Sequence, residues 1–158
     1  MPKGTDLRSL DSIHLADWLN TPQEWRNPDL QERFSLLVEL RPFVMKALEE
    51  ERAKGLIGSS LEAKVVFETA SQRDQEYLTG RLKDLPEAFI VSQVEVRKVD
   101  SVENGVSPQF SQTKVMIVKA DGQKCVRCWN YRELGVSAEH PQLCGRCAEV
   151  VMRIGKTV

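Results

Sequence analysis

The chain has 158 residues, of which 41% are hydrophobic and 28% are charged, as is typical of a soluble globular protein. It contains no run of about eighteen apolar residues and no apolar N-terminal stretch, so it predicts neither a membrane span nor a secretory signal. We therefore expect a cytoplasmic protein without a membrane partner. The net charge of −1 neither favours nor excludes nucleic acid, but residues 119–158 alone carry 7 basic and 4 acidic side chains.

A long helix is predicted between Asn27 and Gly55. Asn27 is a favoured helix N-cap, and a glycine such as Gly55 commonly ends a helix. Apolar side chains recur between them at helical spacing, and this stripe should face a core: Leu30, Phe34, Leu37, Val44 and Leu48. Pro42 lacks a backbone donor, so we expect it to kink the helix or split it near Leu40. Residues 12–18, which precede the helix, favour an extended run.

The middle of the chain predicts a small α/β unit. Alternation and β-branching indicate three strands, at residues 63–68, 89–96 and 114–119. Residues 71–85 predict a helix, because Ser71 is a favourable cap and Pro86 should end the helix. The polar residues 100–112 predict a loop.

All four cysteines lie in two Cys-x2-Cys pairs, and fifteen residues separate Cys128 of the first pair from Cys144 of the second. Two intervening residues let a tight turn direct both thiolates at one ion about 2.3 Å away. In a chain without an export signal, such pairs favour a metal over disulfides. We therefore expect one structural zinc ion, held by Cys125, Cys128, Cys144 and Cys147. Gly145 should take a positive φ inside the second turn.

His140 is expected to pack or form hydrogen bonds, because four cysteines already satisfy the zinc ion. The ion should supply the folding energy of residues 121–152, which contain few large apolar side chains.

The fold class is therefore predicted to be α+β, in three parts. Residues 1–62 are expected to be a linker and helix, and residues 63–120 a small α/β unit with about three strands. Residues 121–158 are expected to form the zinc-binding module, a four-cysteine knuckle.

The residues around the cysteines resemble the C-terminal zinc-binding module of bacterial-type isoleucyl-tRNA synthetases. The resemblance rests on several segments in the same order, namely residues 12–18, Arg41, Val44, residues 46–49, 57–63, 89–94, 124–131, 140–141 and 143–147. The first of these is similar to the segment that leaves the anticodon-binding domain of those enzymes. The resemblance runs from about Ser12 to Met152 and is weakest across residues 100–112.

The resemblance implies a role in holding isoleucine tRNA by its anticodon region, together with the remainder of the synthetase. The four cysteines match the metal ligands of that module. The chain has no HIGH-like or KMSKS-like motif, so we expect no ligase activity from it alone. The family has several hundred residues before the position of Met1, which indicates an excised or separately encoded fragment.

Five residues near the cysteines are candidate RNA contacts: Lys124, Arg127, Trp129, Arg132 and Arg146. Cationic side chains bind phosphates, and aromatic rings stack on unpaired bases. The cations also have an alternative role, because zinc with four thiolates carries a net charge of about −2 that they can neutralise. For Trp129 and Tyr131 the alternative is that they cover the knuckle with apolar mass.

Two further hypotheses compete with tRNA binding. DNA glycosylases of the formamidopyrimidine type end in a similar finger and use an N-terminal proline as nucleophile, which invites comparison with Pro2. Here Lys3 and Gly4 follow that proline, whereas the glycosylases have an acidic residue. The third hypothesis is a structural module that docks on the rest of a synthetase and touches no RNA.

Overall fold

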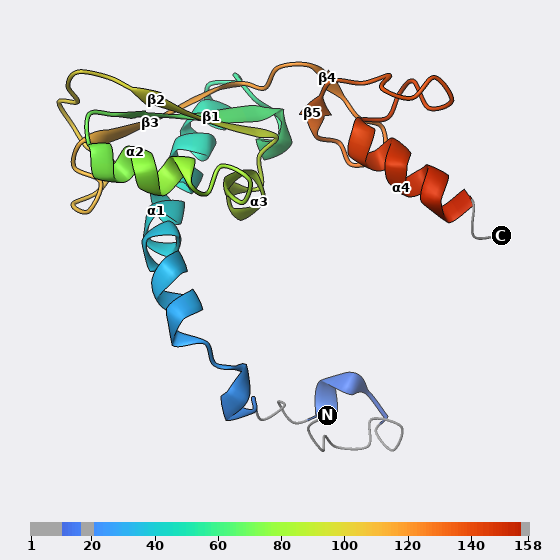
Figure 1. Cartoon of the computed structure of the whole chain (residues 1–158), viewed down its shortest axis with the longest axis horizontal. Coiled ribbons are helices and arrows are strands. Elements are labelled where there is room, and N and C mark those ends of the chain that lie inside the picture. Colours follow the sequence, from blue (N-terminus) through green and yellow to red (C-terminus); the bar gives the residue numbers. More distant parts are fainter. Residues whose placement is uncertain (1–10, 17–20, 156–158) are drawn as a thin grey trace. The chain divides into compact units, whose positions relative to one another are not determined.

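The computed structural model describes residues 11–16 and 21–155. Its contacts divide the chain into two compact units, Met1–Leu36 and Leu37–Val158. The first unit holds two short 3-10 helices, η2 (Ile13–Leu15) and η3 (Gln23–Trp25), and the start of the long helix α1 (Pro28–Ala53), which continues into the second unit (Figure 1).

The expected extended run over residues 12–18 is wrong where the structure describes it. Ser12 accepts hydrogen bonds from two backbone N–H groups, that of Leu15 on its carbonyl and that of His14 on its hydroxyl. These contacts close the turn of η2 instead of leaving the backbone extended. Residues 17 and 18 lie outside the described part of the chain.

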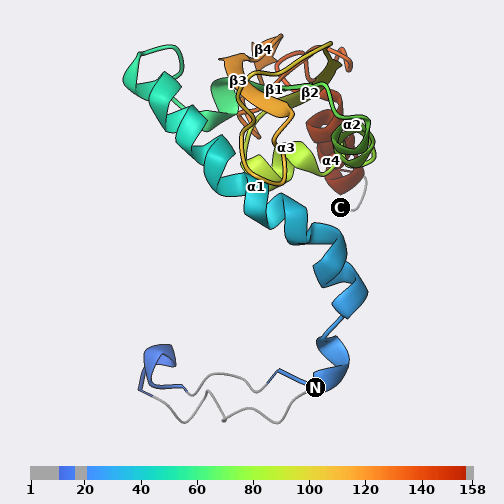
Figure 2. The same ribbon diagram turned by 90° about the vertical axis from the view of Figure 1, so that its left-hand side faces the viewer.

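Helix α1 begins and ends as its sequence predicts. The Asn27 side chain accepts from the Leu30 N–H at 2.9 Å, and Gly55 follows the last turn with a φ of 76°. The helix nevertheless runs unbroken through Pro42, so the predicted split near Leu40 is wrong (Figure 2). Pro42 leaves the Val38 carbonyl without its helical partner, but Val38 is 68% exposed, so water can reach that carbonyl.

The core-facing stripe of α1 is shorter than expected. Leu30 is 47% exposed and Phe34 is only partly buried, so neither forms part of the core. The buried side chains of the helix all lie further along: Leu37, Leu40, Val44 and Leu48. Leu40 and Val44, on either side of Pro42, are fully buried. Their burial stabilises the helix on both sides of the proline.

A three-stranded sheet forms the centre of the second unit. Strands β1 (Ala63–Thr69), β2 (Gln93–Lys98) and β3 (Thr113–Lys119) pair in the order β2-β1-β3. β1 is parallel to β2 and antiparallel to β3, and its Val65 lies opposite Val94 and Ile117. The first and third predicted strands are confirmed, and the 3-10 helix η4 (Ser60–Glu62) leads into β1.

The connection from β1 to β2 differs from the prediction. Ser71 caps helix α2 (Gln72–Thr79) as expected, but α2 ends at Thr79, well before Pro86. A second short helix, α3 (Leu85–Phe89), then begins with Pro86 in its first turn, where proline needs no donor. Its last residue, Phe89, packs on Phe67 with ring centroids 5.8 Å apart. The second strand therefore starts four residues later than predicted, at Gln93.

A buried polar network connects α2 to the sheet. Asp74, which is 3% exposed, accepts from the Thr113 hydroxyl at 2.8 Å, and that hydroxyl lies 2.9 Å from the Thr69 hydroxyl. Each buried polar side chain thus has a partner, as a stable core requires.

The zinc-binding module follows β3. It contains a small antiparallel hairpin, β4 (Gln123–Lys124) and β5 (Tyr131–Arg132), and the C-terminal helix α4 (Gly145–Gly155). The α+β class and the three-strand unit predicted from the sequence are confirmed. Within the described ranges, no helix combines the length and apolar character that crossing a bilayer requires.

Candidate metal centre and its surface

The first cysteine pair lies in the turn of the β4–β5 hairpin. The Cys125 N–H donates to the Asn130 carbonyl at 3.0 Å, and the Trp129 N–H donates to the Cys125 carbonyl at 2.9 Å. These two bonds close a knuckle around Cys125 and Cys128. Trp129 completes the turn with a φ of 64°, a left-handed conformation that glycine adopts more easily.

The second cysteine pair lies at the start of α4. Cys144 accepts from the Ala148 N–H at 2.9 Å, and Cys147 falls in the first turn of the helix. Gly145 is the first residue of α4 and is not among the positive-φ glycines, so that expectation is wrong. The helical turn brings two residues three positions apart to the same face, which replaces the expected tight turn.

The four cysteine sulfurs come together in one cluster, with all ligand atoms within 4.8 Å of one another. The Cys128 and Cys144 sulfurs are 3.8 Å apart. A zinc–sulfur distance of about 2.3 Å in a tetrahedron requires sulfurs about 3.8 Å apart, so the cluster fits the ion. The Cys144 N–H also donates to the Cys125 sulfur at 3.4 Å. His140 does not belong to the cluster.

The surroundings of the four cysteines favour the thiolate form at Cys125 and the thiol form at Cys147. Burial raises the pKa of the Cys125 thiol, but backbone N–H groups of Cys128, Cys144 and Arg127 outweigh burial and bring it to about 6. Burial raises the pKa of Cys147 to about 11, although the Arg127 guanidinium, 3.8 Å from its sulfur, opposes this rise. Zinc binds thiolates, so its binding would displace the remaining thiol protons.

The module has its own small core, and the cysteines make up most of it. The buried members of this core are Cys125, Leu143, Cys144, Cys147 and Ala148. Partly buried side chains of α4 and the hairpin pack around them. Because so little apolar surface is buried, we expect metal binding rather than hydrophobic packing to supply most of the stability of this part of the chain.

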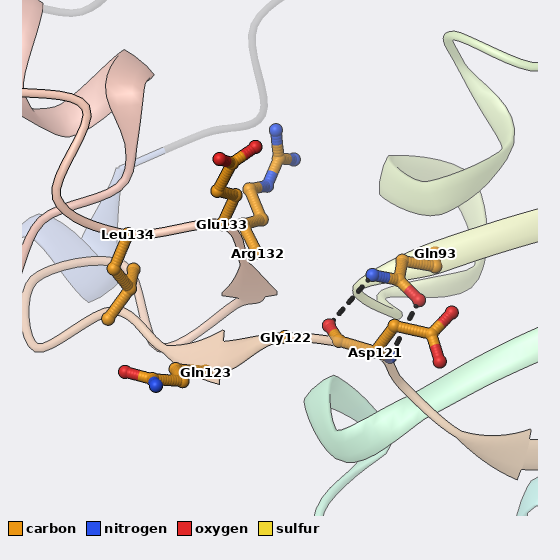
Figure 3. Close-up of a pocket in the computed structure, with 7 residues that line it drawn as sticks. All are labelled: Gln93, Asp121, Gly122, Gln123, Arg132, Glu133 and Leu134. Atoms are coloured by element: carbon orange, nitrogen blue, oxygen red, sulfur yellow. Dashed lines mark hydrogen bonds between the residues drawn. The ribbon is translucent and has the colours of Figure 1, made fainter.

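Two neighbouring residues at the start of β2 hold the module against the sheet. The Gln93 side chain accepts from the Asp121 N–H at 2.9 Å and donates to the Asp121 carbonyl at 3.0 Å, as Figure 3 shows. The Ser92 hydroxyl accepts from the Tyr131 N–H at 2.7 Å and donates to the Leu61 carbonyl. Sequence reasoning missed this joint, because its partners lie up to 39 residues apart.

Gln93→Ala is expected to loosen this joint without affecting the metal centre. The substitution removes both bonds to the Asp121 backbone, which we expect to cost about 1–2 kcal/mol locally. Hydrogen exchange measured by NMR should become faster at the Asp121 amide, while the metal content stays the same. Gln123→Ala is the matched control, because Gln123 lines the same pocket and its side chain makes no hydrogen bond with the described residues. Equal exchange rates in both variants would contradict a role for Gln93.

The five candidate RNA contacts lie on the surface of the module. Lys124, Arg127, Arg132 and Arg146 are all exposed, and Trp129 is 59% exposed. More than half of the Trp129 surface thus faces solvent, and the Lys124 ammonium lies 5.3 Å from the centre of its ring. Tyr131 is partly buried instead. Arg127 contacts a cysteine sulfur, which supports charge neutralisation as one of its roles.

Comparisons with known proteins agree with this geometry. Residues 122–150, which contain all four cysteines, match the family described as the zinc finger found in FPG and IleRS. Together with the sulfur cluster, this match confirms the expected zinc cofactor.

Longer similarity connects the chain to isoleucine–tRNA ligases. The ligase of Syntrophotalea carbinolica is 41% identical over 143 residues, which are 89% of this chain and 15% of that protein. The ligase of Staphylococcus epidermidis is 42% identical over 142 residues, with the same coverage. That of Kosmotoga olearia is 38% identical and covers 94% of this chain. The chain thus spans 15–16% of the length of these relatives.

Proposed function

Because the chain is homologous to the C-terminal region of isoleucine–tRNA ligases, we propose that it is the zinc-bearing, tRNA-binding appendage of such an enzyme. In this role it supports the attachment of isoleucine by holding the anticodon region of isoleucine tRNA. The remainder of the synthetase, in the same chain or a separate one, carries the chemistry. Since tRNA charging serves translation, we place this function in the cytoplasm.

The observation that carries the proposal is the surface around the metal centre. Lys124, Arg132 and Arg146 are exposed and form no ion pair with the described residues. Cations of this kind bind RNA phosphates. Trp129 presents an exposed ring beside them, and such a ring stacks on an unpaired base. The proposed ligands, Cys125, Cys128, Cys144 and Cys147, hold both halves of this surface together through zinc.

The two competing hypotheses have less support. The zinc finger is shared with the glycosylase family, but the similarity over 89% of the chain is to isoleucine–tRNA ligases. The glycosylase hypothesis depended on Pro2, which lies outside the described residues. A purely structural docking module can explain the cations, which can neutralise the zinc–thiolate charge, but it gives no role to the exposed Trp129 ring beside them.

Binding of an isoleucine tRNA transcript at increasing salt tests the proposal. We compare the wild type with a triple variant, Lys124→Gln, Arg132→Gln and Arg146→Gln. Each lost phosphate contact should reduce the slope of log affinity against log salt by about 0.7–0.9, so the triple variant should lose about 2 in slope and bind more weakly at low salt.

The matched control removes three exposed lysines of the α/β unit: Lys83→Gln, Lys98→Gln and Lys114→Gln. It has the same change in net charge and should retain most of the affinity. Equal losses in the two triple variants would show a diffuse charge effect and contradict a defined surface. No binding of the wild type at low salt would favour the docking module instead.

A further inference from the structure

A groove lies between α3 and the zinc-binding module. It encloses about 240 Å³ and is lined by Pro86, Glu87, Ile90, Asn130, Arg132 and Arg146, among others. Its two walls therefore come from the α/β unit and from the module, which the Ser92 and Gln93 contacts hold together. The volume is below the range of about 300–1,000 Å³ that encloses a drug-sized molecule, and suits a single planar ring.

The groove carries uncompensated positive charge. The side chains of Arg132 and Arg146 make no hydrogen bond or ion pair with the described residues, and in Figure 3 the Arg132 guanidinium points away from the Gln93–Asp121 contact. Glu87 is the single carboxylate among the lining residues. Arg132 and Arg146 both line this groove, and their guanidinium groups can bind a phosphate through charge-assisted hydrogen bonds.

Ile90 provides a second, independent observation. Its φ of 56° places a β-branched residue in the left-handed region at the end of α3, where glycine or asparagine is usual. Its side chain is 53% exposed and gains little from burial. When packing contributes little stability to offset backbone strain at a residue, the strain points to a function for its side chain. Within the described ranges, Trp129 is the other non-glycine residue with a positive φ.

Asn130 gives the groove a hydrogen-bonding group. Its side-chain nitrogen donates to the Cys128 carbonyl at 3.2 Å, while its side-chain oxygen accepts no hydrogen bond from the described residues. An acceptor at this position suits the amino or imino edge of a base. The groove thus combines cations, an apolar surface and one acceptor.

We propose that this groove binds one unpaired nucleotide of the RNA, with its phosphate on Arg132 and Arg146 and its base against Ile90 and Pro86. The inference rests on the proposed tRNA-binding function and adds to it a site formed jointly by α3 and the module. A base within a duplex cannot enter, because it remains stacked on its neighbours.

Ile90→Ala tests the groove with a residue that lies outside the metal centre. We expect it to bind isoleucine tRNA about three- to ten-fold more weakly than the wild type, with an unchanged salt slope, because it removes base contact and no charge. Val38→Ala is the matched control, since Val38 is an equally apolar side chain on α1 that is 68% exposed. It should leave the affinity unchanged.

Ile90→Gly distinguishes a loss of RNA contact from a loss of protein stability. Glycine relieves the left-handed backbone, so the melting temperature should stay the same or rise while the affinity falls as in Ile90→Ala. A short single-stranded RNA should compete for binding to the wild type, whereas a duplex of the same sequence should compete poorly. In Ile90→Gly this preference for the single strand should shrink.

The outcomes are distinct. If the wild type binds tRNA with a steep salt slope but Ile90→Ala and Val38→Ala bind equally well, the groove proposal fails and the tRNA-binding function stands. If single-stranded and duplex RNA compete equally, the groove proposal fails as well. If the wild type does not bind tRNA at all, both fail.

Discussion

Replacing Cys125 or Cys147 by serine is expected to unfold residues 121–152 and leave the sheet and its helices folded. Structural zinc contributes on the order of 10 kcal/mol to such modules, far more than their small apolar core. Losing one thiolate breaks the closed tetrahedron and opens the cluster in which all four sulfurs lie within 4.8 Å. In NMR spectra, the amide signals of the module should collapse into the narrow chemical-shift range of an unfolded chain. The amide signals of β1 and β3 should not change.

Val126→Ser is the matched control, because Val126 lies inside the first Cys-x2-Cys pair and is exposed. It introduces the same side chain without removing a ligand, so one zinc ion per chain should remain. The same collapse should follow when a chelator removes metal from the wild type. If the module keeps its signals after chelation and elemental analysis finds no metal, zinc does not hold it together.

Phe67→Ala is expected to destabilise the α/β unit and to leave the metal centre intact. Phe67 is fully buried in β1 against Phe89, and truncating a buried phenylalanine costs about 3–5 kcal/mol. The free energy of unfolding of the α/β unit, measured in urea, should fall by that amount. The zinc content at low urea should stay at one ion per chain, because the cysteines form a separate cluster with its own packing.

Phe43→Ala is the control for this second prediction. Phe43 lies on α1 and is 37% exposed, so its truncation should cost much less than that of Phe67. If Phe67→Ala also releases zinc under native conditions, the two cores form one cooperative unit and are not stabilised separately.

Local patterns in the sequence predicted much of this architecture. Asn27 and Ser71 cap helices because each has its acceptor close to the orphan N–H groups that it satisfies. β1 and β3 follow from β-branched residues in short alternating runs. The cysteine pairs predicted the cluster, because spacing alone limits where four sulfurs can meet.

The errors arise where distant residues decide the local structure. Helix α1 passes Pro42 because Leu40 and Val44 are both buried by other elements, which the helix sequence does not reveal. Phe89 has strand character by type but is buried in α3 against Phe67, 22 residues earlier. Tertiary packing overrides intrinsic propensity in both places.

At the site, too, some features follow from local sequence and others depend on residues that are distant in the sequence. The four cysteines form two close pairs whose spacing in the sequence predicts the cluster, whereas the groove needs Ile90 and Arg146, which only the fold brings together. Positive φ was expected at Gly145 and occurs at Trp129 instead, because the second pair opens a helix and the first closes a hairpin turn. Sequence spacing does not distinguish these two ways of presenting a cysteine pair.

The left-handed backbone at Trp129 and Ile90 matters to anyone who wishes to engineer this chain. Each such residue costs about 1–2 kcal/mol relative to glycine, so a search for thermostable variants would select glycine at both positions. Those variants would refold readily and resist heat, yet they would lack the indole and the isoleucine side chain. Heat resistance is therefore a misleading criterion for improving this protein.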